Sequence, residues 1–212
     1  MTNFIPIFPL DLVVFPGEQL NLHIFEPRYK QLITECVSSG KPFGIPAVIA
    51  GKMMEMGTLL QVKEVSKLYD DEKMDIKTEG LQVFKILEII KELPDKLYSG
   101  AIVTYPPNIA KSSPTKMKII VKGIRALHAS LNVNKQFAKP DEELNSFDVA
   151  HHAGLSAEDE YRLLELPQEL QRQEFLKRHL DKVVPIMEHM DLLKGKIKLN
   201  GHFKSLEGFK FS

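Results

Sequence analysis

The sequence predicts an α+β protein in which an antiparallel, barrel-like β-sheet comes first and a bundle of helices follows. Two observations carry this prediction. Short apolar segments with the two-residue period of strands fill most of residues 1–110, and a single helical segment interrupts them. From residue 111 onward the apolar residues recur with a helical period instead. Because helices do not alternate with the strands, an antiparallel pseudo-barrel is favoured over a parallel sheet.

About six strands are expected in the first part of the chain. The acidic run Asp70–Lys73 is expected to form a hairpin loop, and Gly80 to mark a β-bulge. The segment Gly51–Gly57 is expected to be a turn between two strands. The strands are expected at Leu20–Ile24, Phe43–Ala50, Thr58–Tyr69, Met74–Thr78, Leu81–Ile90 and Tyr98–Thr104, after two short apolar runs at Ile5–Leu10 and Leu12–Phe15.

A helix is expected to begin at Pro27. Proline suits the first helical position, because its missing N–H would have no partner there, and Glu26 favours the positive end of the helix dipole. Apolar residues then recur at helical spacing from Tyr29 onward, Cys36 among them, and Gly40 ends the helix. The single cysteine is therefore expected to be a buried thiol in a reducing compartment.

The chain is expected to divide at Pro106–Pro114 into a barrel subdomain of residues 1–110 and a helical subdomain of residues 111–193, followed by a basic tail of residues 194–212. Pro185 is expected to bend the last helix, because it donates no hydrogen bond and its ring collides with the preceding turn. The helices are expected to begin near Pro114, Asp141, Ser156 and Gln168, and the short second one is expected to run from Asp141 to Ala153.

The composition excludes several classes of protein. Lys and Arg (28) balance Asp and Glu (28), so no overall field draws the chain onto nucleic acid or an anionic membrane. The first residues lack the basic region of a secretion signal, and no stretch of about 18 apolar residues is present that could cross a bilayer. A cytoplasmic protein that does not enter the membrane is expected.

The segment Ile5–Leu32 reads IPIFPLDLVVFPGEQLNLHIFEPRYKQL. Its order of apolar runs, prolines and a closing F-E-x-R-Y resembles the opening of the amino-terminal substrate-binding domain of Lon proteases, especially the small proteins made of that domain alone. The resemblance implies a PUA-like pseudo-barrel followed by a helical bundle, and unfolded or damaged polypeptides as ligands. Relatives often carry G-x-x-R-F in the middle strands. Gly80 and Phe84 match this pattern, but Val83 replaces the arginine.

The chain lacks the catalytic motifs of a complete Lon protease. It contains no G-x-x-x-x-G-K-[ST] phosphate loop, no G-x-S-x-G, no H-E-x-x-H and no segment like the serine-bearing one of the Lon peptidase. The histidines show no metal-site spacing, because the adjacent His151 and His152 would point about 100° apart on a helix. No catalytic residue, metal or cofactor is therefore expected.

Candidate binding residues are three methionines and an arginine. Met53, Met54 and Met56 lie in the expected turn, where exposed, flexible thioethers suit the recognition of diverse apolar segments. The alternative is that one or two of them plug the end of the barrel. Arg28 is a candidate contact for a peptide carboxylate, although a local pair with an acidic side chain is the favoured interpretation.

The tail Lys194–Ser212 contains five lysines and one glutamate, with phenylalanines between them. Such a pattern can bind single-stranded nucleic acid, but Ile197, Leu199 and Phe203 nearly alternate, which favours a strand or an extended arm that docks on its own protein or on a second copy. The favoured function is a non-enzymatic binding module for unfolded or damaged polypeptide segments, with an ATP-dependent protease as a candidate partner. An RNA-binding protein and an enzyme of unrecognised class are the alternatives.

Overall fold

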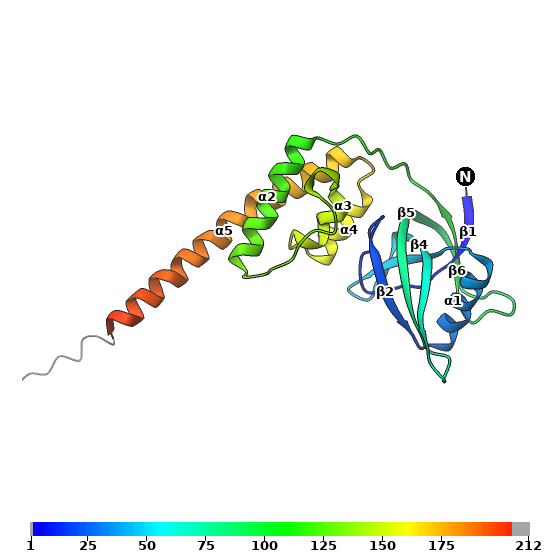
Figure 1. The fold of residues 1–212 in the computed structure, drawn as a ribbon. Coiled ribbons are helices and arrows are strands. Elements are labelled where there is room, and N and C mark those ends of the chain that lie inside the picture. The colour runs from blue at the N-terminus through cyan, green and yellow to red at the C-terminus, as the bar shows by residue number, and fades with distance from the viewer. Residues whose placement is uncertain (1, 205–212) are drawn as a thin grey trace, which may run out of the picture.

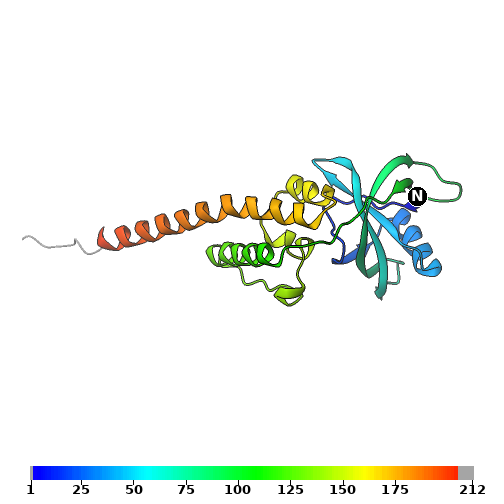
Figure 2. The ribbon, with the colours of Figure 1, turned by 90° about the horizontal axis from the view of Figure 1, so that it is seen from above.

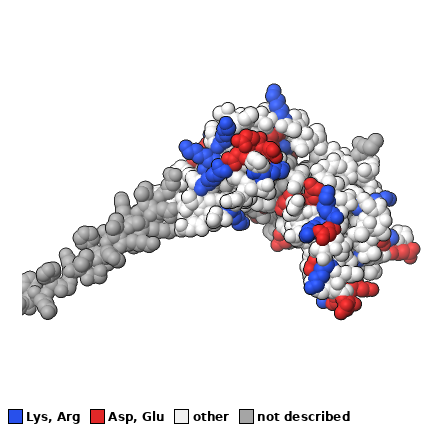
Figure 3. Space-filling model, in the orientation of Figure 1, with Lys and Arg blue, Asp and Glu red and all other residues white. Residues whose placement is uncertain are grey.

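A barrel-like sheet at one end and a helical subdomain at the other make up the protein (Figures 1 and 2). The computed structural model describes the backbone of residues 2–204, and the side chains through residue 187 and at residue 189. Basic and acidic side chains are interspersed on the face of the protein in Figure 3. The elements are β1 (Thr2–Pro6), β2 (Gln19–Ile24), α1 (Pro27–Ser39), β3 (Phe43–Ile49), β4 (Lys52–Leu68), β5 (Met74–Ile90), β6 (Gly100–Thr104), α2 (Pro114–Ser130), η1 (Asp141–Glu143), α3 (Ser146–Val149), η2 (Ala150–His152), α4 (Ala157–Glu165) and α5 (Glu169–Lys204).

The six strands form one antiparallel sheet in the order β1-β6-β5-β4-β3, and β2 pairs with β5 beside this row. The segment after β1 then runs alongside β3, to which it is joined by parallel bridges from Ile7 to Gly44 and from Leu10 to Ala47. These bridges bring the two ends of the row together. The expected antiparallel pseudo-barrel is confirmed, although the closure consists of isolated bridges and not of a continuous ladder.

The long strands β4 and β5 bend at the bulge that the sequence predicts. Leu59 faces Gln82 whereas Leu60 faces Gly80, so one extra residue is accommodated on β5. A side chain at Gly80 would collide with the carbonyl oxygen of Phe15. Glycine at this position therefore allows the chain segment before β2 to cross close over β5.

The helix ends mostly follow the expected capping residues. Pro27 begins α1, and Gly40 ends it with φ of 65°. Ser113 caps α2 through a hydrogen bond from the Lys116 amide. The single helix expected over Asp141–Ala153 is wrong, because Asn145 forms a capping box that starts α3 anew and separates it from the 3₁₀ turn η1.

The helices and the barrel share a hydrophobic core. Barrel residues such as Phe15, Ile49 and Met56 belong to the same buried cluster as Ile120 of α2 and Leu163 of α4. The connection after β6 has no regular secondary structure and includes Pro106–Pro114. The division into residues 1–110 and 111–193 remains a prediction, since burial is continuous across it.

The last helix is longer than the sequence predicts. α5 continues past Pro185 to Lys204, and Figure 2 shows that it extends well beyond α2. The strand or extended arm expected from Lys194 onward is therefore wrong as far as Lys204. Each residue added to an existing helix gains a hydrogen bond without a new nucleation cost, so α5 continues through residues with little helical preference. Residues 205–212 of the predicted tail lie outside the described residues.

Candidate functional site

The three predicted methionines lie on a strand and not in a turn. The turn consists of Ala50 and Gly51 alone, with φ of 50° and 76°, and joins β3 to β4 as a tight hairpin. Two successive positive φ angles characterise the two-residue turns that suit the twist of paired strands. Met53, Met54 and Met56 therefore begin β4, and the expectation of a turn over Gly51–Gly57 is wrong.

These methionines are at least half buried, on two different sides of the sheet. Met53 packs against the cluster in the barrel that contains Phe84. Met54 packs against the core shared with the helices, and Met56 is buried within it. The Met56 amide donates a hydrogen bond of 3.1 Å to the hydroxyl oxygen of Tyr161 on α4. The start of β4 is thus a surface on which α4 packs, and a role for its methionines in client binding remains a prediction.

Arg28 is engaged locally, at the start of α1. Its Nη2 lies 2.7 Å from Oε2 of Glu26, and its guanidinium carbon lies 4.5 Å from the ring centroid of Tyr29. The side chain is still about half exposed, at 52%. The local pair expected from the sequence is confirmed, and contact between Arg28 and a peptide carboxylate remains a prediction.

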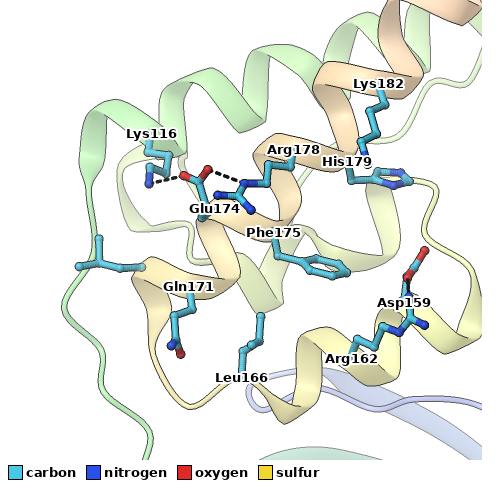
Figure 4. Close-up of a pocket in the computed structure, with 11 residues that line it drawn as sticks. Lys116, Asp159, Arg162, Leu166, Gln171, Glu174, Phe175, Arg178, His179 and Lys182 are labelled. Carbon is cyan, nitrogen blue, oxygen red and sulfur yellow. Dashed lines mark hydrogen bonds and ion pairs between the residues drawn. The ribbon is translucent and has the colours of Figure 1, made fainter.

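An open groove of about 770 Å³ lies between α4 and the first turns of α5, beside the start of α2 (Figure 4). Phe175 points from α5 toward α4. Together with Leu166 and Leu170, which also line the groove, it forms the apolar floor. Two of these side chains come from α5 and the third from the short connection after α4. The groove therefore exists only when α4 and the start of α5 pack together.

Charged side chains border this groove, and basic ones outnumber acidic ones. Glu174 accepts hydrogen bonds from Lys116 Nζ at 2.7 Å and from Arg178 Nε at 2.9 Å. These two bonds hold the pKa of the Glu174 carboxyl below its ordinary value. Arg162 pairs with Asp159 at 3.1 Å. The basic residues along the groove are Lys116, Arg162, Arg178 and Lys182, and the acidic ones are Asp159 and Glu174.

A buried ion pair positions the start of α5. Arg172 and Glu169 are each only 3% exposed, and Arg172 Nη2 lies 3.1 Å from Glu169 Oε2. Glu169 also accepts hydrogen bonds from the amide and the hydroxyl of Ser146 at the start of α3. Arg172 donates to the Leu166 carbonyl and to Oδ1 of Asn108 in the connection after β6. Burial lowers the pKa of the guanidinium, and the nearby carboxylate opposes this change.

A histidine joins the barrel to the helices. His151 Nε2 lies 3.1 Å from Glu18 Oε2, and its Nδ1 lies 2.7 Å from Glu160 Oε1. Desolvation lowers the pKa of this imidazole, but the hydrogen bonds and charges of the two carboxylates outweigh it and raise the pKa to about 10. The imidazolium therefore bridges a barrel loop and α4 at neutral pH.

The sequence did not reveal the groove or these supporting contacts. The sequence predicts no role for Phe175, and the pairing of Arg172 with Ser146 joins residues far apart in the chain. For His151 the sequence bears only on a metal site and gives no sign of its contacts with Glu18 and Glu160. The part of the chain that the structure describes contains no cluster of three or more potential metal-binding side chains. None of its helices is long and apolar enough to cross a membrane.

The comparisons with known proteins agree with this architecture. The family described as the ATP-dependent protease La (LON) substrate-binding domain matches residues 5–182. A Lon N-terminal domain protein from Xanthomonas campestris aligns with a TM-score of 0.63 at 21% identity, over 82% of this chain and 96% of that one. The N-terminal domain of a Lon protease from Mycobacterium avium complex aligns with a TM-score of 0.59 at 15% identity, over 85% of this chain and 99% of that one. With the family match spanning most of its length, this chain belongs to the Lon substrate-binding domain family, a family of non-catalytic domains.

Proposed function

We propose that the protein binds exposed apolar segments of unfolded or damaged proteins, and that the groove between α4 and α5 holds them. The observation that carries this proposal is the combination of an apolar floor around Phe175 with an excess of basic side chains along the groove. Apolar side chains of a client would be removed from water on the floor, and acidic residues beside them would meet Arg162, Arg178 and Lys182. The preferred client segment is therefore apolar with acidic neighbours.

The family membership supports a substrate-binding role, and the small number of side chains on the groove floor suits loose recognition of many sequences. We further propose that the bound segment is delivered to a separate ATP-dependent protease. If the protein only holds clients, reversible binding is sufficient. If it delivers them, the protease should degrade the client faster in its presence than in its absence.

The test compares two serine substitutions on α5. Phe175→Ser removes the floor of the groove, whereas Ile186→Ser changes an apolar side chain that is 59% exposed and does not line it. Binding of a fluorescent, reduced and carboxymethylated protein should weaken at least about tenfold for Phe175→Ser and stay unchanged for Ile186→Ser. Lys182→Glu should weaken the same binding at low salt more than at high salt.

Equal binding by Phe175→Ser and by the unmodified protein, with both folded by circular dichroism, would show that the groove is not the client site. Delivery is tested by adding the protein to an ATP-dependent protease from the same cytosol and following client degradation. An unchanged degradation rate would remove the delivery role and leave the holding role.

A further inference from the structure

Among the residues that the structure describes, strand β2 is hydrogen-bonded along one side only. It pairs with β5, and the Gly80 amide donates to the Glu18 carbonyl at 2.8 Å just before β2 begins. In an antiparallel pair the residues whose backbone groups face the partner alternate with residues whose groups face away. The Glu18–Gly80 bond sets this alternation, so the N–H and C=O groups of Gln19, Asn21 and His23 face away from β5.

These outward backbone groups have no hydrogen-bond partner within the described part of the chain. The side chains of Gln19, Asn21 and His23 are exposed as well. The corresponding edge of β3 is different, because the bridges from Ile7 and Leu10 cover it.

The edge of β2 also lacks the features that normally prevent strand addition. Its six residues, Gln19–Ile24, include no lysine and no proline, and its ladder with β5 has no bulge. Natural sheets usually protect a free edge with such residues or cover it with another element. An unprotected edge therefore indicates a surface on which another strand can pair.

Two leucines show what kind of strand fits there. Leu20 and Leu22 point toward the barrel interior and pack against its core cluster, but they are only partly buried. A strand added to β2 would place every second side chain beside them. Apolar residues at those positions would extend the existing core, which favours a segment whose apolar residues alternate.

We propose that β2 binds extended polypeptide segments by strand addition, through the backbone groups of Gln19, Asn21 and His23. This inference rests on the proposed function and deepens it, because recognition of the main chain explains how clients of different sequence are held. Gln19, the first residue of this edge, also lines a cavity of about 610 Å³ between barrel and helices, into which the end of a bound segment would extend.

The geometry makes a specific prediction about the ligand. Client residues opposite Asn21 and His23 would turn their amides toward β2. The side chains of these client residues would point outward, so polar residues are expected there. Client residues opposite Leu20 and Leu22 would turn their amides away from β2. The side chains of these client residues would lie beside the two leucines, so apolar residues are expected there. The probe is a labelled peptide of alternating valine and threonine. Methylating the threonine amides should weaken binding at least about tenfold, because each lost hydrogen bond leaves groups unpaired. Methylating the valine amides should leave binding unchanged.

A protein variant provides the second measurement. Asn21→Pro removes an N–H that faces solvent and places the proline ring where the added strand would lie, whereas Asn21→Ala keeps the N–H. Peptide affinity measured by fluorescence anisotropy should fall at least about tenfold for Asn21→Pro and stay unchanged for Asn21→Ala. If Asn21→Pro does not fold, the two methylated peptides still decide the question.

Equal binding of both methylated peptides would overturn strand addition at β2. If the client protein then still binds and Phe175→Ser weakens that binding, the groove proposal stands without the β2 site. If the unmodified protein binds neither the peptide nor the carboxymethylated protein, both proposals fail.

Discussion

The buried pair of Arg172 and Glu169 should be the polar contact whose loss destabilises the protein most. We expect Arg172→Met to keep most of the apolar length of the side chain while it removes the charge. The Glu169 carboxylate would then remain buried without a counterion, and such a change typically costs about 3–5 kcal/mol. For a chain of this length, at about 2–4 °C per kcal/mol, the melting temperature should fall by roughly 6–20 °C.

Two further variants distinguish the cost of leaving the Glu169 carboxylate buried and unpaired from the cost of losing an arginine side chain. Arg178→Met, on the same helix, removes a side chain that is 73% exposed and pairs with Glu174, so it should cost less than about 1 kcal/mol. The double variant Arg172→Met with Glu169→Gln removes the stranded charge and retains an amide oxygen for Ser146. It should be more stable than Arg172→Met alone by at least about 1 kcal/mol.

Urea unfolding of the four proteins, followed by circular dichroism, measures these differences. The reasoning is refuted if Arg172→Met unfolds at the same urea concentration as Arg178→Met. It is also refuted if Glu169→Gln destabilises the Arg172→Met variant further, because the buried carboxylate would then not be the source of the cost.

Three other predictions follow from burial and charge. Serine at both Met53 and Met54 should lower the melting temperature by about 4–8 °C, because emptying packed methionine sites costs about 2 kcal/mol. Stability should decrease as the pH rises from 6.5 through about 10, because the unfolded chain releases the His151 proton while the folded protein retains it; His151→Gln should flatten this dependence. Cys36 should react with iodoacetamide only after unfolding, since it is 3% exposed and burial raises its pKa to about 11.

Each of these outcomes can be contradicted by a simple measurement. If the variant with serine at Met53 and Met54 kept its melting temperature but bound clients more weakly, the two methionines would be exposed client contacts and not packed residues. If stability depended on pH in the same way after His151→Gln, other groups would be responsible for the dependence. Rapid labelling of Cys36 in the native protein, measured by mass spectrometry, would show that the buried side of α1 becomes exposed without unfolding.

Local sequence signals predicted the parts of the fold that local physics controls. Pro27, Gly40 and Ser113 mark helix ends because each acts on the backbone within one turn. Gly80 also marks a bulge, but the reason there is tertiary, because a side chain would collide with the carbonyl oxygen of Phe15. The turn before β4 was misjudged because Gly51 and Gly57 are both turn formers in sequence, but only Gly51 has a positive φ. Gly57 instead lies within β4, where its missing side chain lets the backbone of Ile45 approach closely.

The candidate groove could not be predicted in this way. Phe175 and Arg162 lie on different helices, and nothing in their own neighbourhoods indicates that they border one groove. The start of α5, which carries Phe175, is held by Arg172, whose partners Ser146 and Asn108 lie 26 and 64 residues away in the chain.

The sequence by itself determined the family, the order of strands and helices and most of their ends, because these depend on apolar periodicity and on capping within a few residues. Only the tertiary structure decided which surfaces remain open. It paired β2 on one side alone, buried Met56 against α4 and extended α5 past Pro185. The physical reason is that exposure is what remains after all elements have packed, so it depends on contacts between residues that the chain brings together only on folding.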